Sequence, residues 1–386
     1  MKTKFIPFIA HLLEEDDIQS VLEVLRSDWI VSGPKVIEFE KSFKEYIGCK
    51  YAVALNSCTS ALHLLLATLN IKEGDEVITT PFTFVATSNA ILYQKATPVF
   101  VEVREDTFNI DPSKIEEAIT PRTKAILLTH YGGQPAQLDE IREIAQRHHL
   151  FLLEDAAHAI GAEYKGKKVG SFGLGACFSF HAVKNVISGE GGMIATESQE
   201  IAEKAKKLRF FGIESDAWKR NKSEDYWHYE VEELGFKYNM MDIQAAMGIS
   251  QLKKVDRFQI TRDQYAEMYN QAFEQIPEIK TPTVLPEVKT SWHLYVIKLN
   301  LKMLTISRDN LVRVLRESGV GTNIHYLPLH LHKYFREKFK YQWGNFPICE
   351  SLYQQILSLP LYQKMTREEV NLVIEIVTDT IKKYRC

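Results

Sequence analysis

The chain has 386 residues, of which 45% are hydrophobic and 25% are charged, and its 47 basic and 50 acidic side chains leave a formal net charge of −3. These fractions are those of an ordinary globular protein and argue against a disordered or fibrous chain. The slightly acidic balance gives no electrostatic reason to expect nucleic acid or an anionic membrane as a partner.

The N-terminal residues do not have the pattern of a signal peptide. The apolar stretch 5–13 contains Pro7 and His11, and four acidic residues follow it where a cleavage site would need small residues. We interpret it as a strand or loop that runs into the first helix. No apolar run reaches the roughly 18 residues of a membrane span, and five scattered cysteines without CxxC spacing fit a reducing compartment. We therefore expect a cytoplasmic protein.

Short β-branched segments alternate with segments of helical periodicity between about residues 50 and 200. This alternation is typical of βαβ units and predicts a mostly parallel sheet with helices on both faces. The expected strands are 51–55, 76–80, 97–103, 124–130, 151–155, 176–180 and 193–196, and the expected helices are 60–69, 112–118, 138–149 and 198–209.

The second half of the chain has a different organisation. Segment 211–239 lacks periodicity and predicts a long irregular connection of the kind that is usually functional or interfacial. A long helix and a smaller α/β region follow, and Thr366 with Glu369 predicts a capping box for the last helix. We expect a large domain over 1–240, a linking helix over 241–276 and a small domain over 277–386, with a strand near 293–299 and helices near 308–318 and 366–384.

An acidic and a basic side chain each follow an apolar strand. Asp155 ends segment 151–155, and Lys184 follows segment 176–180, ahead of Gly189-Glu-Gly-Gly192. The carboxyl ends of strands form the ligand crevice of open α/β sheets, so both groups can act on one ligand. Pyridoxal phosphate needs such a pair, because a lysine forms an imine with its aldehyde while a carboxylate keeps its pyridine nitrogen protonated. Taken singly, a solvated loop lysine and a turn or capping aspartate are the commoner interpretations.

Small hydroxyl residues follow the first strand, in Asn56-Ser-Cys-Thr-Ser60 at the start of an expected helix. Free N–H groups at a helix N-terminus suit a phosphate, whereas an N-cap by Ser57 or Thr59 is the simpler alternative. Ser179 offers a further hydroxyl. Phe84, after the strand 76–80, offers a ring that can stack on a flat cofactor, although core packing is the commoner role of such a residue.

Several further motifs occur along the chain, namely Trp29-Ile-Val-Ser-Gly-Pro34, Glu154-Asp-Ala-Ala-His-Ala159, Ser179-Phe-His-Ala-Val-Lys-Asn185, Gly235-Phe-Lys-Tyr-Asn239, Trp292-His-Leu-Tyr295, His325-Tyr-Leu-Pro-Leu-His330 and Leu359-Pro-Leu361. With these motifs the chain resembles, almost from end to end, the DegT/StrS family of pyridoxal-phosphate-dependent nucleotide-sugar aminotransferases. It looks most like those that make UDP-4-amino-4-deoxy-L-arabinose or spore-coat polysaccharide sugars. The resemblance implies a type I, aspartate aminotransferase-like fold.

The resemblance implies roles for the residues at the cofactor. Lys184 would be the Schiff-base lysine and proton shuttle, and Asp155 would hold the ring nitrogen. His158 would lie near the phenolic oxygen, where many relatives carry Gln, and Phe84 would stack on the ring. The phosphate would be bound by Thr59, Ser60 and Ser179.

Other implied roles concern the substrate and a second subunit. Asn239 would reach the cofactor from a partner chain, which requires a homodimer with shared active sites. His181 and His325 look like substrate-side residues, although either alone would more often be structural. Arg220, in the connection that varies most among relatives, is interpreted either as an anchor for the nucleotide pyrophosphate or as a solvent-facing charge.

The implied activity is amino transfer from glutamate to a nucleotide-linked keto sugar, in particular a UDP-4-keto sugar. One alternative is a sugar dehydratase, but dehydrating relatives carry His in place of the lysine. Another is a non-catalytic regulator, but Lys184 is present and no DNA-binding module extends the chain. A nicotinamide dehydrogenase is excluded because no G-x-G-x-x-G follows the first strand. The cluster His325, His330 and His332 lacks the spacing and carboxylates of a metal site, so we expect no metal.

Overall fold

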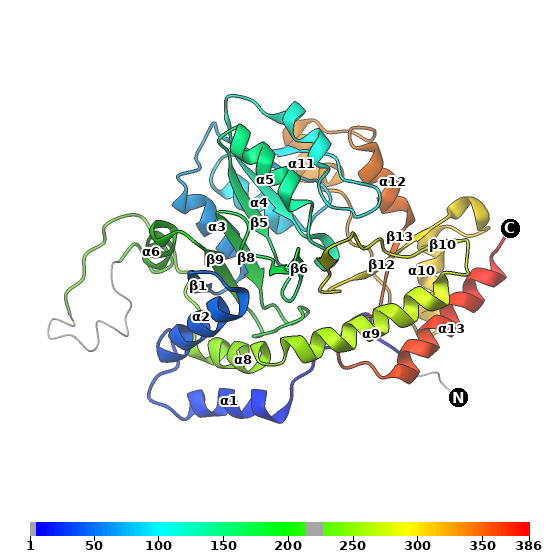
Figure 1. The fold of residues 1–386 in the computed structure, drawn as a ribbon, viewed down its shortest axis with the longest axis horizontal. Helices are drawn as coiled ribbons and strands as arrows, with labels where there is room; N and C mark the ends of the chain where they lie inside the picture. The colour runs from blue at the N-terminus through cyan, green and yellow to red at the C-terminus, as the bar shows by residue number, and fades with distance from the viewer. Residues whose placement is uncertain (1–4, 214–226) are drawn as a thin grey trace.

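The computed structural model describes residues 5–213 and 227–386. Within these residues a seven-stranded sheet forms the centre of the fold (Figure 1). Neighbouring strands are parallel except at β9, which is antiparallel to both of its neighbours. In spatial order the strands are β1 (Tyr51–Leu55), β9 (Gly192–Thr196), β8 (Gly175–Ser179), β5 (Phe151–Asp155), β4 (Thr123–Thr129), β2 (Glu76–Thr79) and β3 (Thr97–Phe100).

Both faces of this sheet are apolar, as a sheet covered by helices on both sides requires. Successive side chains of a strand point to opposite faces, so Ala52 and Ala54 of β1 join one core cluster while Val53 and Leu55 join another. The prediction of a mostly parallel sheet between two helical layers is confirmed. One face packs against α2 (Pro34–Ile47), α5 (Leu138–Arg147) and α8 (Asp242–Leu252), and the other against α3 (Cys58–Thr68), α4 (Val85–Tyr93) and α6 (Gln199–Leu208).

Two predicted elements of this half differ from the structure. The strand predicted over 97–103 ends at Phe100. The helix predicted over 112–118 is a pair of 3₁₀ turns, η1 (Pro112–Lys114) and η2 (Glu116–Ala118). The Asp111 side chain accepts from the Ser113 N–H and starts the first turn. A segment this short makes few i→i+4 bonds, which favours the tighter i→i+3 geometry.

The single helix predicted over 241–276 is wrong. The structure has two helices there, α8 and α9 (Val255–Phe273), which follow one another in the lower half of Figure 1, above α1. At the break, the Lys254 N–H donates to the carbonyl of Gln251. The Lys254 ammonium lies 2.5–3.1 Å from three carboxylates of the acidic segment, those of Glu14, Asp16 and Asp17. This anchoring fixes the chain direction between the two helices.

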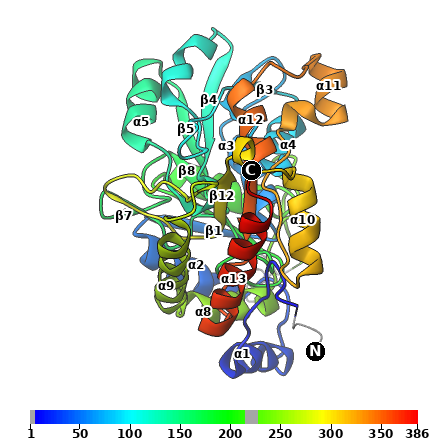
Figure 2. The ribbon, with the colours of Figure 1, turned by 90° about the vertical axis from the view of Figure 1, so that its right-hand side faces the viewer.

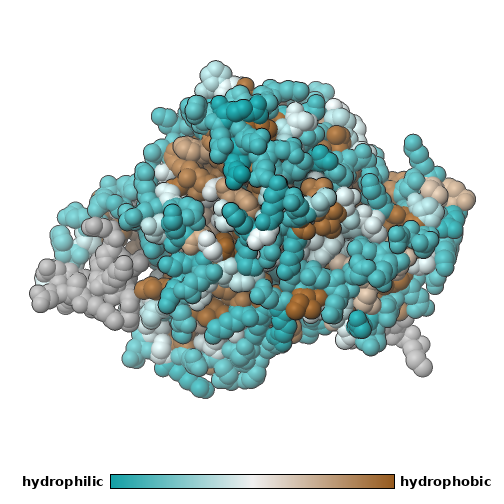
Figure 3. Space-filling model, viewed as in Figure 1, coloured by the Kyte–Doolittle hydropathy of each residue, from teal (hydrophilic) through white to brown (hydrophobic). Residues whose placement is uncertain are grey.

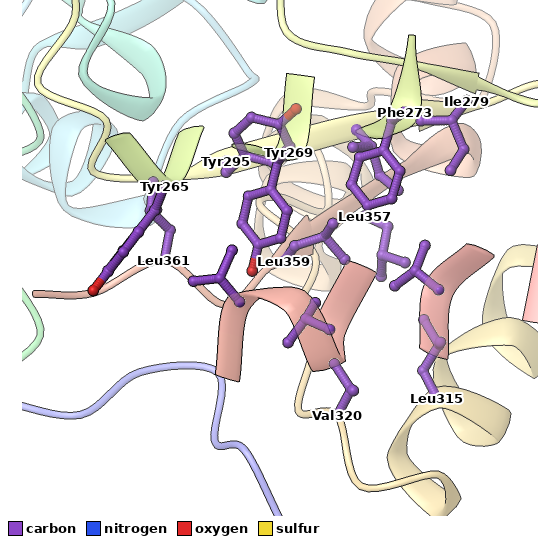
Figure 4. Close-up of a cluster of buried hydrophobic side chains, with 14 of the residues drawn as sticks. Tyr265, Tyr269, Phe273, Ile279, Tyr295, Leu315, Val320, Leu357, Leu359 and Leu361 are labelled. Atoms are coloured by element: carbon purple, nitrogen blue, oxygen red, sulfur yellow. The ribbon is translucent and has the colours of Figure 1, made fainter. Parts of the chain in front are cut away.

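A second core lies at the C-terminal end of the molecule. Tyr269 and Phe273 of α9 pack against Tyr295, Leu357 and other apolar residues there (Figure 4). Within the described residues this core is covered by a three-stranded antiparallel sheet and by two helices. The sheet comprises β10 (Ile279–Lys280), β12 (Tyr295–Leu299) and β13 (Ile356–Leu359), and the helices are α10 (Arg308–Glu317) and α13 (Arg367–Lys383). Of the two helices, α13 lies between α9 and α10 (Figure 2).

The N-terminal segment belongs to this second core. Ile6 pairs with Val320 as an isolated bridge and is buried in the same apolar cluster. The chain then returns to the large sheet, where α1 (Glu15–Leu25) packs against α8. The remaining described elements are β6 (Glu163–Tyr164), β7 (Lys167–Lys168), β11 (Val288–Lys289), η3 (Tyr131–Gly133), η4 (Leu301–Met303), η5 (Leu329–Leu331), α11 (Lys333–Phe339) and α12 (Pro347–Gln355).

The predicted capping box of the last helix is confirmed and gives a stability prediction. The Glu369 N–H donates to Thr366 Oγ1 at 3.2 Å, and the Thr366 N–H donates to Glu369 Oε2 at 3.0 Å. Thr366→Ala should lower the free energy of unfolding by about 1 kcal/mol, the usual cost of losing such a cap. Urea unfolding followed by circular dichroism measures this change. Thr366→Ser, which keeps the hydroxyl, is the matched control, and equal losses in both variants would contradict the capping role.

The described helices include none that is both long and apolar enough to cross a bilayer. The face of the molecule seen in Figure 3 is mainly hydrophilic, with separate small hydrophobic patches. Isolated apolar patches of this kind are normal on folded proteins.

Candidate active site

The carboxyl ends of three neighbouring strands meet at one edge of the large sheet. They bring Thr129 of β4, Asp155 of β5 and Ser179 of β8 together on the face that carries α3, because these residues share the strand alternation of Leu153 and Cys177. All three line a cavity of about 390 Å³. A volume in this range suits a cofactor or small ligand.

Asp155 is a buried carboxylate that faces this cavity. The Thr87 hydroxyl donates to its Oδ2 at 2.6 Å, and the Ala157 N–H donates to its Oδ1 at 3.1 Å. Burial raises the pKa of Asp155, while these two donors and the nearby Lys184 act in the opposite direction. Both donors are neutral groups, so a ligand that presents a cationic N–H here would supply the charge partner that a buried carboxylate favours.

Three threonine hydroxyls form a chain that fixes this carboxylate. Because Thr87 donates to Asp155, its oxygen must accept from Thr83, at 2.9 Å. Thr83 in turn accepts from Thr129, at 3.0 Å. Each hydroxyl therefore donates in the direction of Asp155, and the orientation of the carboxylate is set before any ligand binds.

Lys184 lies in the connection between β8 and β9 and lines the same cavity. The Ala182 N–H donates to the carbonyl of Gly189, and the Lys184 N–H donates to the carbonyl of His181, which makes this connection compact. Gly189 has φ +78°, a conformation that glycine adopts without strain. Burial lowers the pKa of the Lys184 ammonium to about 8. The amine is then neutral in about one tenth of the molecules at pH 7.

The start of α3 forms another wall of the cavity. Ser57 is the N-cap and accepts from the Ser60 N–H at 3.1 Å. Ser57 and Thr59 line the cavity, whereas the Ser60 hydroxyl donates to Asn56 Oδ1 at 2.7 Å. Gly192 allows this wall to approach the sheet, because a Cβ there would lie 2.3 Å from the Ser57 carbonyl oxygen. The cavity therefore has a helix N-terminus with free N–H groups beside Thr59.

His158 is buried and is positioned by both of its ring nitrogens. Its Nδ1 accepts from the Gly132 N–H at 3.3 Å, and its Nε2 lies 3.1 Å from the hydroxyl of Tyr326. Its ring also lies against His293, with 4.3 Å between the ring centroids. Burial holds the pKa of both histidines well below the ordinary value, so both rings are neutral at pH 7.

Tyr326 and His293 are cavity residues that the sequence analysis did not identify. The signal for them was present, since each lies beside a residue already noted, in the motifs 325–330 and 292–295. Phe8, from the N-terminal segment, was missed as well, and its ring lies 5.3 Å from that of His325. None of the three has a spacing that separates it from a core aromatic residue in the sequence alone.

The predicted stacking residue Phe84 and the substrate-side candidates His181 and His325 also line the cavity. Phe84 is 57% exposed there, with its ring 6.0 Å from that of Tyr326. His325 Nδ1 lies 2.8 Å from the Ser358 hydroxyl, and burial lowers the pKa of His325 to about 4. His181 Nε2 lies 3.6 Å from a carboxylate oxygen of Glu190.

Two expected site residues do not line the cavity, and a third lies outside the described residues. Ser60 and Asn239 are not among its lining residues. Asn239 Nδ2 donates to Ser32 Oγ at 2.5 Å, while its Oδ1 is buried without a hydrogen bond among the described residues. Arg220 lies outside the described residues. Of the histidines considered for a metal site, His330 pairs with a carboxylate, its Nε2 lying 2.9 Å from Glu350 Oε1.

Comparison with known proteins adds to this geometry. The model of the DegT/DnrJ/EryC1/StrS aminotransferase family matches residues 11–378. The spore coat polysaccharide biosynthesis protein SpsC of Bacillus subtilis is 45% identical over 382 residues, 99% of this chain and 98% of its own. Helicobacter pylori PseC, an aminotransferase involved in the biosynthesis of pseudoaminic acid, is 33% identical, with TM-score 0.92 over 99% of this chain and 100% of its own. NtdA of Bacillus subtilis, solved with bound cofactor PMP, is 31% identical, with TM-score 0.87 over 99% of this chain and 86% of its own.

Proposed function

The chain belongs to the DegT/DnrJ/EryC1/StrS aminotransferase family, and from this premise we propose that it moves an amino group from glutamate to a keto sugar carried on a nucleotide. It is a sugar aminotransferase with pyridoxal phosphate as its cofactor. The proposed parts are glutamate as the donor and a UDP-linked 4-keto sugar as the acceptor. The observation that carries the proposal is the convergence of Lys184 and Asp155 on one cavity beside the N-terminus of α3.

The residues present fit this cofactor. Asp155 offers a buried carboxylate with only neutral donors, as a protonated ring nitrogen requires. Thr59 and Ser179 place hydroxyls at the cavity wall, with the first N–H groups of α3, where a phosphate would be bound. Phe84 offers an exposed ring face. When bound, pyridoxal phosphate supplies the aldehyde that links to amines and the ring that delocalises electrons from the reacting carbon.

Lys184 is the residue proposed to move the proton. Its pKa of about 8 allows Nζ to be neutral in a useful fraction of molecules at pH 7 and to be protonated again afterwards. In each half-reaction Nζ would take a proton from the carbon that loses the amino group and deliver it to the carbon that gains the amino group. Asp155, fixed by Thr87, keeps its charge in place during both steps. The apolar part of the cavity wall limits access of water to this proton.

The sugar substrate follows from the relatives and from the cavity. SpsC is a spore coat polysaccharide biosynthesis protein, and PseC acts in the biosynthesis of pseudoaminic acid. In this chain His181 and His325 line the cavity with polar groups suited to hydroxyl and carbonyl oxygens. Arg220, outside the described residues, is the proposed anchor for the nucleotide pyrophosphate.

We further propose a homodimer with shared active sites, in which Asn239 serves the cavity of the partner subunit. Asn239 does not line the cavity of its own chain, and its Oδ1 is buried without a partner among the described residues. Close to it in the chain, Val231 and Leu234 are 59% and 89% exposed, an apolar surface that a second subunit would cover. Sedimentation analysis tests this, and a monomer at micromolar concentration would contradict it.

We also propose that the protein works in the cytoplasm. All five cysteines are free, and four of them are buried. Free cysteines of this kind are typical of proteins in a reducing compartment. Secretion of the protein from its native cells in oxidised form would contradict this assignment.

The function is tested by following each half of the reaction. The protein loaded with pyridoxal phosphate is mixed with glutamate, and 2-oxoglutarate is measured. The aminated protein is then mixed with a panel of nucleotide keto sugars that differ in nucleotide and in keto position, and the return of the original absorbance identifies the acceptor. Regeneration by amino-acid-derived keto acids and by no keto sugar would overturn the proposal.

The two hydroxyls at the start of α3 give a prediction about cofactor binding. Thr59→Ala should weaken the affinity of the apoprotein for pyridoxal phosphate by about tenfold to a hundredfold, because a hydrogen bond to a charged group contributes about 1.5–3 kcal/mol. Ser60→Ala should change it by less than about threefold, since the Ser60 hydroxyl is committed to Asn56 and Ser57. Absorbance titration of each apoprotein measures both affinities. Equal losses would show that Ser60 turns to the phosphate as well.

A further inference from the structure

The hydroxyl of Tyr326 is a polar group of the cavity that the function described above does not use. Tyr326 is contributed by the segment before η5, and its side chain lies among residues of the large sheet domain. In the described part of the chain its hydroxyl has one hydrogen bond, to His158 Nε2 at 3.1 Å. The direction of that bond decides what the hydroxyl can offer to a ligand.

The other side of the His158 ring settles this direction. Nδ1 accepts from the Gly132 N–H, so Nδ1 carries no proton. Burial keeps the pKa of His158 well below its ordinary value, so the ring is neutral and its single proton is on Nε2. Nε2 therefore donates to the Tyr326 oxygen. A phenol that accepts this bond retains its own O–H for another acceptor.

The position of the Tyr326 ring is fixed by aromatic neighbours. Its centroid lies 6.0 Å from that of Phe84 and 6.4 Å from that of Tyr131, in an edge-on arrangement with the latter. The Tyr131 hydroxyl donates to the carbonyl of His325, the residue before Tyr326. The backbone and the ring are thus both held, and a donor that is already oriented loses little free energy when it binds its acceptor.

From this chain of bonds we propose that Tyr326 is a hydrogen-bond donor into the cavity, aimed by His158 and Gly132 at an oxygen atom of the bound reactants. His158 is then a positioning residue that acts through Tyr326. Two oxygens have the required chemistry, namely the phenolic oxygen of the cofactor and the carbonyl oxygen of a keto substrate. The second of these rests on the proposed function, whereas the first requires only that the cofactor binds.

The test compares Tyr326→Phe, which removes only the hydroxyl, with Tyr334→Phe as a matched control on the exposed helix α11. If the acceptor is the phenolic oxygen, Tyr326→Phe should move the pH midpoint of the bound cofactor's visible absorbance by about one pH unit, since one net hydrogen bond changes a protonation equilibrium about tenfold. If the acceptor is the keto oxygen, the midpoint stays and kcat/KM for the keto-sugar half-reaction should fall about tenfold to a hundredfold. The glutamate half-reaction is unchanged in that second case.

A double variant tests the role of His158. His158→Leu should reproduce the effect of Tyr326→Phe, and the double variant should be no more affected than the more affected of the single variants, because both substitutions break one chain of bonds. If the effects of the two substitutions multiply, the proposed chain of hydrogen bonds is wrong. If Tyr326→Phe changes neither the absorbance midpoint nor either half-reaction, the proposed role of Tyr326 as a donor is wrong. If the wild type binds the cofactor but aminates no keto sugar, the proposed function fails, and the absorbance midpoint alone decides this inference.

Discussion

Replacing Lys184 with alanine is expected to lower the rate of amino transfer by about 10⁴-fold, the upper end of what one positioned acid–base group contributes. The reason is that Lys184 has two proposed tasks, the covalent link to the cofactor and the movement of the proton. The Lys184 side chain is half-buried at the cavity, and its pKa of about 8 matches both tasks. The loss should appear in both half-reactions, because each includes proton movement at a carbon atom.

Two further measurements separate this role from a merely structural one. The visible absorbance of the bound cofactor should change in Lys184→Ala, because no ε-amine remains to react with its aldehyde. Lys41→Ala removes an exposed lysine of α2 and should leave both absorbance and rate unchanged. Lys184→Arg keeps a cation but has a guanidinium that stays protonated, so it should be as inactive as the alanine variant. Transfer in Lys184→Ala within tenfold of the wild type would refute the assignment.

The position of Lys184 and Asp155 at one cavity was predictable from the sequence because local patterns were sufficient. Each residue follows a short apolar strand, and parallel strands of an α/β sheet deliver their carboxyl ends to one edge. The alternation of side chains along β5 then decides that Asp155 faces α3, while Glu154 points to the opposite face and pairs with His130. These rules act within a few residues, so they can be applied without a structure.

The choice between Thr59 and Ser60 was not predictable. Neighbouring residues of a helix point about 100° apart, so only the rotational phase of α3 decides which hydroxyl faces the cavity. A polar stripe normally reveals that phase. In α3 almost every residue is buried, including Ser60, Ala61 and Leu62, so no polar stripe marks the phase.

Long-range contacts account for the other failures. The hydrogen bond between His158 and Tyr326 joins residues 168 positions apart, and the position of Tyr326 beside His325 does not by itself distinguish it from a core tyrosine. The break between α8 and α9 accompanies the ion pair of Lys254 with Asp16, 238 positions away. The apolar periodicity continues through the break, so a single helix was the natural prediction. Contacts of this kind are set by the assembled fold.

Asp155→Ala is expected to slow amino transfer by about 10²–10³-fold, the usual effect of removing one oriented electrostatic group from an active site. The carboxylate is held by the Thr87 hydroxyl and the Ala157 N–H, and its charge is what would keep a ring nitrogen protonated. Without that charge the ring accepts electrons from the reacting carbon less readily. Steady-state kcat with glutamate and the identified keto sugar measures the loss.

Stability should respond differently from activity in this variant. Burial raises the pKa of Asp155, which means that the ionised carboxylate has a free-energy cost in the folded apoprotein at neutral pH. Removing it also removes two hydrogen bonds, and the two effects offset each other to within about 1 kcal/mol. The unfolding free energy of the apoprotein should therefore stay within about 1 kcal/mol of the wild-type value, while amino transfer falls by about a hundredfold or more.

Rescue by a modified cofactor gives the decisive comparison. An N-methylated pyridoxal phosphate has a permanent positive charge on the ring nitrogen, so it does not need a carboxylate to stay charged. It should raise the rate of Asp155→Ala at least about tenfold. It should not raise the rate of Lys184→Ala, because the proton carrier is missing there. Thr87→Val, which leaves the carboxylate but cuts the hydroxyl chain, should lose about tenfold and gain little from the analogue. An Asp155→Ala variant that is slow with either cofactor would mean that the carboxylate orients the ring and does not hold its charge.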